Sequence, residues 1–223
     1  MNNVDITHRF HLKGSILSIN RSNNDLIIIT QHYSAFKINK TMRLKELAVL
    51  LNSKELPHRY SKTTSANANL ISLAESSSNI LSIAEIQESA RIITRLDDHK
   101  KTISASRFSN DNNILASGGE DGRVHIYDTN KFQKIITLPY RPDYISSINF
   151  SKDSRFLFAS CFNKSNMVFD CQRTKITNIF NTNEVVEWAD FFDNNSKLFI
   201  VLRNSNSIIY DIRANQTINI STP

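Results

Sequence analysis

A segment of roughly 42 residues recurs along this chain and limits the folds that it can adopt. Three copies align almost without gaps, and each ends in an aspartate preceded by an aromatic residue: Tyr127-Asp128, Phe169-Asp170 and Tyr210-Asp211. In each copy a leucine stands 13 positions before that aspartate: Leu115, Leu157 and Leu198. Fixed offsets at this period indicate a series of similar supersecondary units packed side by side.

Two weaker copies precede these three. The first covers 16–39 and ends in Asn39, with Leu26 again 13 residues earlier, and the second ends in Glu85. The five end positions are 46, 43, 42 and 41 residues apart. This spacing is typical of the four-stranded blades of β-propellers.

Each copy also reads as four short strands separated by polar turns. In the third copy, the four predicted strands are 103–108, 114–117, 123–127 and 134–138. A tight turn is predicted at 118–122, between the second and third strands. The segment 42–51 has leucines that could share one face of a helix, but its place in the repeat favours an outer strand. With only four glycines in the chain, we expect asparagine to supply the turns that need positive φ.

The third copy resembles a WD40 repeat. Leu115-Ala116-Ser117-Gly118-Gly119 matches the inner strand of that family and its following turn, Asp121-Gly122 matches the turn aspartate and glycine, and Tyr127-Asp128 stands in place of Trp-Asp. His99 takes the position of the histidine in the family's Gly-His pair, with Asp98 in place of the glycine. The resemblance implies a structural hydrogen-bond network of Asp121, His99, Ser117 and Tyr127.

We therefore expect an all-β protein, a single β-propeller domain over 1–223 built from four-stranded antiparallel blades. The expected blades are 13–52, 57–97, 99–139, 141–181 and 183–221, preceded by an N-terminal strand at 5–12. In WD40 rings such a strand completes the last blade, and the usual ring would need roughly 70 more residues at this period. We expect about five blades here and an incomplete ring.

No group of residues in the sequence is typical of catalysis. Neither a glycine-rich phosphate loop nor a G-x-S-x-G elbow is present, and the six histidines do not cluster with the two cysteines. His8 and His11 are an odd number of residues apart, so on a strand they would point to opposite faces. We expect no enzyme activity, no metal and no cofactor.

The compartment is predicted from what the sequence lacks. No apolar run approaches the ~18 residues of a membrane span. The segment 1–11 has no apolar core for a secretory signal, and two cysteines are too few for a disulfide framework. We expect a cytoplasmic monomer without membrane contact.

Positive charge gathers at the N-terminal end of the chain. Residues 1–62 hold ten Lys and Arg against four Asp and Glu, whereas the remaining chain holds seventeen of each. The segment 37–45, with Lys37, Lys40, Arg43 and Lys45, is the densest part. Two interpretations stay open: an edge that contacts nucleic acid or an acidic partner, and a solvated hairpin whose lysines discourage edge pairing.

The resemblance implies a non-catalytic scaffold or accessory protein that binds partner proteins through the loops at the His99–Asp121 end of the blades. Loops on a rigid scaffold are where binding residues concentrate. The candidate residues are His32, Lys101, Glu120, Tyr140, Arg141 and Asp143, and the loops 162–165 and 203–206 belong to the same face. Tyr140 and Arg141 are of the types enriched in interface hot spots, although an ordinary solvated loop is the alternative.

Two other functions are carried as alternatives. One is binding of nucleic acid or an acidic partner by the basic first blade. The other is an accessory or maturation role in a bacterial periplasmic nitrate reductase system, because the chain is weakly similar to the small propellers that serve such systems.

Overall fold

The computed structural model contains only β-strands as regular structure in its described part, and these form five four-stranded antiparallel sheets. The described residues are 12, 16–22, 25–30, 34–38, 44–49, 64–67, 70–74, 78–86, 90–139 and 141–220. Within these ranges, no helix is long and apolar enough to cross a membrane.

Each sheet is one blade, formed by four strands that follow one another in the chain. The first blade comprises β1 (Ile16–Ser22), β2 (Asp25–Thr30), β3 (Ser34–Ile38) and β4 (Leu44–Val49). The second comprises β5 (Thr64–Asn67), β6 (Leu70–Ala74), β7 (Leu81–Ile86) and β8 (Ala90–Leu96). The third comprises β9 (Ile103–Phe108), β10 (Ile114–Gly119), β11 (Val124–Asp128) and β12 (Lys134–Thr137).

The last two blades repeat this arrangement with little change in length. The fourth comprises β13 (Ile145–Phe150), β14 (Phe156–Cys161), β15 (Ser165–Asp170) and β16 (Lys175–Asn181). The fifth comprises β17 (Val186–Phe192), β18 (Lys197–Leu202), β19 (Ser207–Asp211) and β20 (Gln216–Ile220). The prediction of an all-β propeller with about five antiparallel blades is confirmed.

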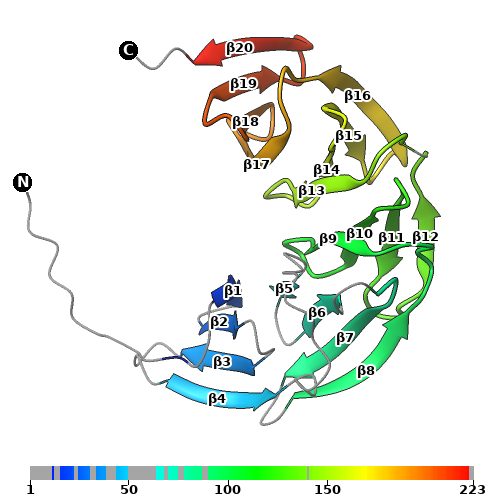
Figure 1. Cartoon of the computed structure of the whole chain (residues 1–223), viewed down its shortest axis with the longest axis vertical. Coiled ribbons are helices and arrows are strands. Elements are labelled where there is room, and N and C mark those ends of the chain that lie inside the picture. The colour runs from blue at the N-terminus through cyan, green and yellow to red at the C-terminus, as the bar shows by residue number, and fades with distance from the viewer. Residues whose placement is uncertain are drawn as a thin grey trace, which may run out of the picture.

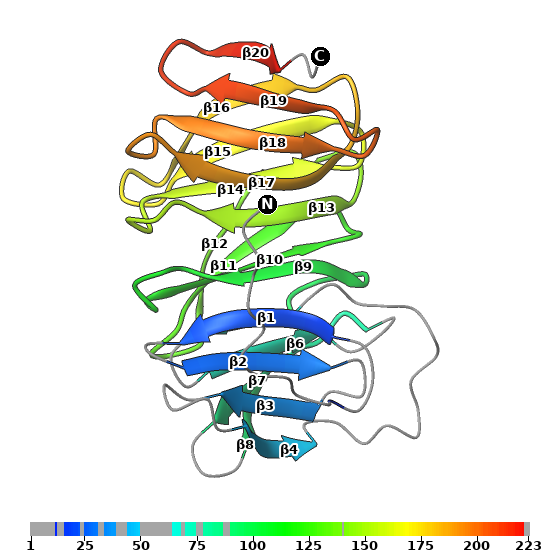
Figure 2. The same cartoon turned by 90° about the vertical axis from the view of Figure 1, so that its left-hand side faces the viewer.

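The blades stand around an axis in chain order. The first strand of each blade contacts the first strand of the next, in the order β1, β5, β9, β13 and β17. Figure 1 shows these strands on the inner side of the arc. The arc is open, and the first and fifth blades lie apart at its two ends (Figure 1). The view turned by 90° shows the same separation, with β1–β4 at one end of the molecule and β17–β20 at the other (Figure 2).

Apolar side chains fill the space between successive sheets. On β14, Leu157 and Ala159 pack toward the third blade, whereas Phe158 packs toward the fifth. This alternation follows from the period of two along a strand. The three leucines at the fixed offset in the sequence repeat, Leu115, Leu157 and Leu198, are fully buried in these layers.

The far face of the fifth blade shows what this packing contributes. Phe158 and Val168 are adjacent partners on β14 and β15, and the fifth blade buries both completely. Phe199 and Ile209 hold the same ladder positions on β18 and β19, yet both are only half-buried. A face of one sheet is therefore fully buried only where another blade covers it.

Polar side chains also link the inner strands. Arg107 on β9 donates from Nε to Asn149 Oδ1 on β13 at 3.2 Å. The Asn149 amide then donates to Ala189 O at 2.8 Å and to Asp190 Oδ1 at 3.2 Å, both on β17. One row of hydrogen bonds thus joins the third, fourth and fifth blades on the inner side of the arc.

The aspartate that ends each of the last three repeats has a turn-forming role. Asp128 Oδ1 accepts hydrogen bonds from the backbone N–H groups two and three residues later, each at 2.8 Å. Asp170 and Asp211 make the same pair of contacts in the next two blades. The carboxylate satisfies backbone donors that the turn between the third and fourth strands leaves unpaired.

Two glycines predicted to lie in a turn belong to a strand. Gly118 and Gly119 are the last residues of β10, so the turn begins later than 118. A Cβ atom at Gly118 would lie 2.5 Å from Ile145 Cγ2, and one at Gly119 would lie 2.6 Å from His99 Nδ1. Close packing against neighbouring side chains therefore explains Gly118 and Gly119. Among the glycines that the structure describes, only Gly122, at φ 69°, has the left-handed conformation.

The prediction that asparagine supplies the positive-φ positions is only partly correct. Of the ten non-glycine residues with positive φ in the described part, four are asparagine: Asn112, Asn194, Asn195 and Asn215. Phe132, Thr174 and Asn215 occupy the same turn of three successive blades, each with φ between 50° and 55°. The blade geometry imposes the conformation there, whatever the residue type.

Two further sequence predictions concern the first blade and the segment before it. The segment 44–49 is a strand, as the repeat predicted, and not a helix. The expected N-terminal strand at 5–12 lies outside the described residues except for Leu12, which is not in a strand and packs beside the buried residues Ile28, Phe36 and Ile38.

Matched truncations test whether a neighbouring blade is the source of this burial. Phe158→Ala should lower the free energy of unfolding by about 3–5 kcal/mol, because it leaves a cavity between two blades. Phe199→Ala at the equivalent position should cost only about 1–2 kcal/mol, because its side chain already meets water. Urea unfolding of the two variants measures the difference, and equal costs would contradict the packing argument.

Candidate functional site

The antiparallel strands of each blade place two sets of loops on two opposite faces of the arc, one at each end of the strands. One end, here called the loop face, carries the loop before each first strand and the loop between each second and third strand. In the third blade these are 97–102 and 120–123. The opposite end carries the turns that follow the first and third strands, and it is here called the turn face.

His99 ties the two loops of the third blade together. Its Nδ1 lies 3.1 Å from Asp121 Oδ1, and its Nε2 lies 2.8 Å from Ser117 Oγ on β10. Asp121 also accepts from the backbone N–H groups of Lys100 at 2.8 Å and Arg123 at 3.1 Å. The structure therefore joins three of the four network residues inferred from the resemblance, Asp121, His99 and Ser117, by direct hydrogen bonds.

Charges in this network follow from burial. Burial lowers the pKa of His99, and the Asp121 carboxylate only partly opposes that shift, so the imidazole is neutral near pH 7. Because a carboxylate can only accept, Nδ1–H donates to Asp121, and Nε2 accepts from the Ser117 hydroxyl. Burial raises the pKa of Asp121, but hydrogen bonds from the Lys100 N–H and from His99 outweigh it and hold that pKa below its usual value.

Tyr127, the fourth network residue, lies fully buried on β11. Burial raises the pKa of its phenol, while a hydrogen bond with Ser117 acts in the opposite direction. The tyrosine thus remains protonated and holds the place that tryptophan has in the family's pattern.

His125 was not singled out from the sequence, yet it packs directly on the network. Its ring centroid lies 4.3 Å from that of His99, and its Nδ1 lies 2.8 Å from Thr137 Oγ1. Its Nε2 is buried and has no partner among the described residues. Burial, together with the nearby His99 and Lys134, lowers the pKa of His125 to about 4.

His99, Asp121 and His125 are close enough to hold a metal ion together, since their ligand atoms lie within 4.8 Å of one another. Both ring nitrogens of His99 already have partners, however. His99 could bind a metal only by giving up its contact with Asp121 or with Ser117. The geometry as it stands suits a hydrogen-bond relay.

The fourth blade holds its loops by other means. Ser160, which matches Ser117, lies 3.1 Å from Ser146 Oγ, and Cys161 Sγ donates to Asp143 O at 3.2 Å. Asp143 Oδ1 accepts from the N–H of Tyr144 at 2.8 Å. The loop before β13 is therefore fixed without a histidine.

A stack of three side chains covers the loop face of the fourth and fifth blades. The rings of Tyr144 and Phe162 stack at a centroid distance of 4.5 Å, with 23° between their planes. The Arg203 guanidinium lies 4.9 Å above the Phe162 ring, and its Nε donates to Glu187 Oε1 at 3.0 Å. All three side chains keep contact with solvent. We call these residues the aromatic–arginine stack.

The sequence placed Phe162 and Arg203 on this face through their loops but missed Tyr144 and the contact itself. Tyr144 stands one residue beyond the patch that was singled out, and no pattern in the sequence shows that three loops from two blades converge. Only the register between neighbouring blades brings these side chains together.

The predicted partner-binding residues are distributed unevenly. Lys101 and Glu120 are exposed on the loop face of the third blade. Arg141 is half-buried, with its backbone N–H bonded to Gly122 O at 2.9 Å and Nη2 at 3.6 Å from Met167 Sδ. His32 and Tyr140 lie outside the described residues.

Of the basic segment at 37–45, the structure describes only the strand portions. Lys37 and Lys45 are cross-strand partners on β3 and β4. Lys40 and Arg43 lie outside the described residues.

The loop face and its network belong to a repeat that is found in other proteins. Residues 90–128 match the family model described as WD domain, G-beta repeat. They run from β8 through β11, so the matched repeat begins with the outer strand of the second blade and ends in the third.

Individual relatives match shorter parts of their own chains. The chain is 28% identical to WD repeat-containing protein 1 of Bos taurus over 88 residues, 38% of this chain and 14% of that protein. It is 30% identical to COMPASS component SWD3 of Saccharomyces cerevisiae over 110 residues, 42% of this chain and 35% of that protein. This chain thus spans well under two thirds of either relative.

A chain in a crystal structure of a mitotic checkpoint complex shares the fold, with a TM-score of 0.74 at 14% identity over 92% of this chain and 64% of that chain. The resemblance to WD40 repeat proteins is confirmed. The weaker similarity to nitrate reductase accessory propellers, which none of these matches supports, stays a prediction.

A double-mutant cycle tests the network. His99→Ala and Asp121→Ala should each lower the free energy of unfolding by about 1–3 kcal/mol, because each leaves a buried polar group without its partner. The double variant should cost much less than their sum. The exposed Arg203–Glu187 pair is the control, with a coupling below about 1 kcal/mol. Additive losses of unfolding free energy at His99 and Asp121 would contradict the hydrogen-bond relay.

Acid should unfold the protein through His125. The unfolded chain takes up a proton there near pH 6.5, whereas the folded chain does so only near pH 4. The free energy of unfolding should therefore be highest above pH 6.5 and fall by about 2–4 kcal/mol as the pH drops to 4. Denaturation at a series of pH values measures this slope. His125→Gln should flatten it, and an unchanged slope in that variant would assign the acid sensitivity elsewhere.

Proposed function

We propose that this protein is a non-catalytic scaffold that binds a partner protein through its loop face, with the aromatic–arginine stack at the centre of the contact. WD40 repeat proteins generally act as protein-interaction scaffolds, and the relative SWD3 and the checkpoint structure are described as parts of complexes. The stack is the observation that supports this proposal most directly.

The physical properties of the stack suit an interface hot spot. Aromatic and arginine side chains dominate binding energy when they are held in place before the partner arrives. Tyr144 and Phe162 support each other, while Glu187 and the Phe162 ring fix the Arg203 guanidinium from two sides. Little side-chain entropy remains to be lost when a partner covers this surface.

The proposed contact extends across neighbouring blades. Glu120 of the third blade is close enough for its charge to raise the pKa of Tyr144, a smaller influence than burial of the phenol. Lys101 and Asp143 add charges of both signs to the same face. A surface with an aromatic centre and a mixed polar rim is typical of protein–protein contacts. We extend the proposal to a cytoplasmic monomer that binds its partner without modifying it.

Capture of the partner tests the proposal. Affinity purification from the native host identifies the protein that co-purifies, and its binding is then measured with purified components. Phe162→Ala and Arg203→Ala should each weaken binding by at least ~1 kcal/mol. Arg141→Ala should also weaken it, while the melting temperature changes little.

Two variants serve as comparisons. Arg95→Ala removes an exposed arginine from β8 and should leave partner binding unchanged. If binding survives the loop-face changes but is lost on neutralising Lys37, Lys40, Arg43 and Lys45, the basic first blade is the interface. A partner that is nucleic acid would then show a steep salt dependence.

A further inference from the structure

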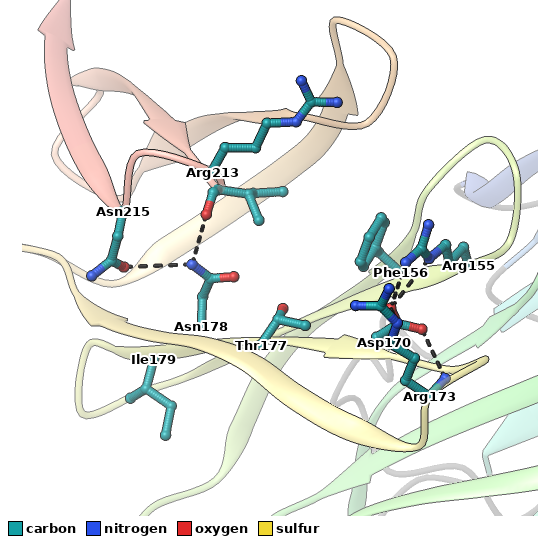
Figure 3. Close-up of a pocket in the computed structure, with 10 residues that line it drawn as sticks. Arg155, Phe156, Asp170, Arg173, Thr177, Asn178, Ile179, Arg213 and Asn215 are labelled. Atoms are coloured by element: carbon teal, nitrogen blue, oxygen red, sulfur yellow. Dashed lines mark hydrogen bonds and ion pairs between the residues drawn. The ribbon is translucent and has the colours of Figure 1, made fainter.

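A hollow of about 470 Å³ lies on the turn face between the fourth and fifth blades (Figure 3). Three arginines from three different turns surround it: Arg155 before β14, Arg173 between β15 and β16, and Arg213 between β19 and β20. Phe156 and Ile212 line it as well, and both pack against the buried layer between these blades. The hollow is thus on the turn face, opposite the loop face that carries the aromatic–arginine stack.

Asp170 is the only carboxylate among the described residues that line the hollow, and both of its oxygens already accept hydrogen bonds. Asp170 has a side chain that is 1% exposed, and its Oδ2 accepts from Arg155 Nε at 3.2 Å and Nη2 at 2.9 Å. Its Oδ1 accepts from the backbone N–H groups of Gln172 and Arg173, each at 3.0 Å. Burial raises the pKa of Asp170, but these hydrogen bonds outweigh it and keep the group ionised. One of the three arginines is therefore neutralised and anchored.

The other two arginines remain available. Arg173 Nε is 4.0 Å from Asp170 Oδ2, too far for a hydrogen bond, and its side chain is 65% exposed. Arg213 is exposed, and the carboxylate that interacts with its charge, that of Asp193, pairs directly with Lys197 at 2.7 Å. Among the described residues that line the hollow, three arginines against one aspartate leave an excess of two positive charges.

The frame that carries Arg213 is fixed to the fourth blade. Asn178 on β16 donates from Nδ2 to Tyr210 Oη at 3.1 Å and to Ile212 O at 2.9 Å, and the Tyr210 hydroxyl donates to Asn215 Oδ1. Figure 3 shows this amide between the two walls of the hollow. The rings of Phe180 and Tyr210 stack at 3.6 Å. The two walls therefore hold their spacing, and a ligand need not order them.

The positive charge is local. Residues 141–220 contain nine Lys and Arg against eight Asp and Glu, so the two blades together are almost neutral. A nucleic-acid backbone needs a basic track that follows many phosphates. Two free arginines in one hollow suit a single compact anion with two charges.

We infer that this hollow binds the phosphate group of a phosphorylated serine or threonine on a partner protein. A phosphate monoester carries a charge between about −1.5 and −2 near pH 7 and offers three oxygens, which two arginine forks can bind. A single carboxylate would leave one positive charge unmatched. The volume beyond the phosphate takes the residues that flank it, over Phe156 and Ile212. This inference does not depend on the loop face being an interface.

Fluorescence anisotropy with the full chain tests the inference. The probes are two labelled peptide pools of random sequence that differ only in a fixed central residue, phosphoserine or serine. We expect the phosphoserine pool to bind at least tenfold more tightly, and the binding to weaken as salt is raised.

Variants assign the binding to the hollow. Arg173→Ala and Arg213→Ala should each weaken binding of the phosphoserine pool about tenfold, because each removes charge-assisted hydrogen bonds. Arg173→Lys and Arg213→Lys should restore part of it, since they keep the charge but lose the fork. Arg95→Ala is the matched control for loss of one exposed arginine and should bind as the wild-type chain does. Melting temperatures show that every variant is folded.

Four outcomes would overturn the inference. Equal binding of the two pools would remove the phosphate requirement. A third pool with glutamate as the fixed central residue that binds as tightly as the phosphoserine pool would assign the hollow to acidic peptides. Competition by inorganic phosphate at the concentration where the phosphopeptide competes would assign it to free phosphate compounds. Binding that survives both alanine substitutions would place the phosphate elsewhere on the chain.

Discussion

Each blade of this protein becomes a stable layer by resting one sheet face on its neighbour. A single four-stranded sheet cannot bury both of its faces, so every blade depends on the next for half of its core. Phe158 and Phe199 occupy the same position in successive blades, but only Phe158 has a blade across from it and is fully buried. The repeat of about 42 residues exists because each copy must present the same two faces.

The layered packing fixes the strands, and the strands then fix the loops. In the third blade a neutral His99 joins the two loops to β10 through Asp121 and Ser117. In the fourth blade Cys161, at the end of β14, holds the loop before β13 instead through Asp143 O. The polar network is thus one of several ways to hold a loop, and the sheet stacking beneath it is common to every blade.

Much of this architecture could be predicted because the repeat records it directly. The leucine and aspartate at a fixed offset mark a core position and a turn-capping carboxylate, both of which depend on local sequence. The aromatic–arginine stack, the hollow beside Arg213 and the contact of His125 with His99 could not be predicted. Each joins side chains from separate turns or strands, and their distance depends on how neighbouring strands and blades are aligned.

The same turn device explains why the two ends of the molecule differ chemically. Because Asp170 and Asp211 satisfy the backbone of their turns, the side chains two and three residues later need not take part in that structure. In the fourth and fifth blades those positions place Arg173 and Arg213 around one hollow, whereas the third blade has Asn130 and Lys131. A repeated turn thus keeps the backbone constant while its exposed positions change the charge. This freedom allows one scaffold to carry an aromatic surface at one end and an anion site at the other.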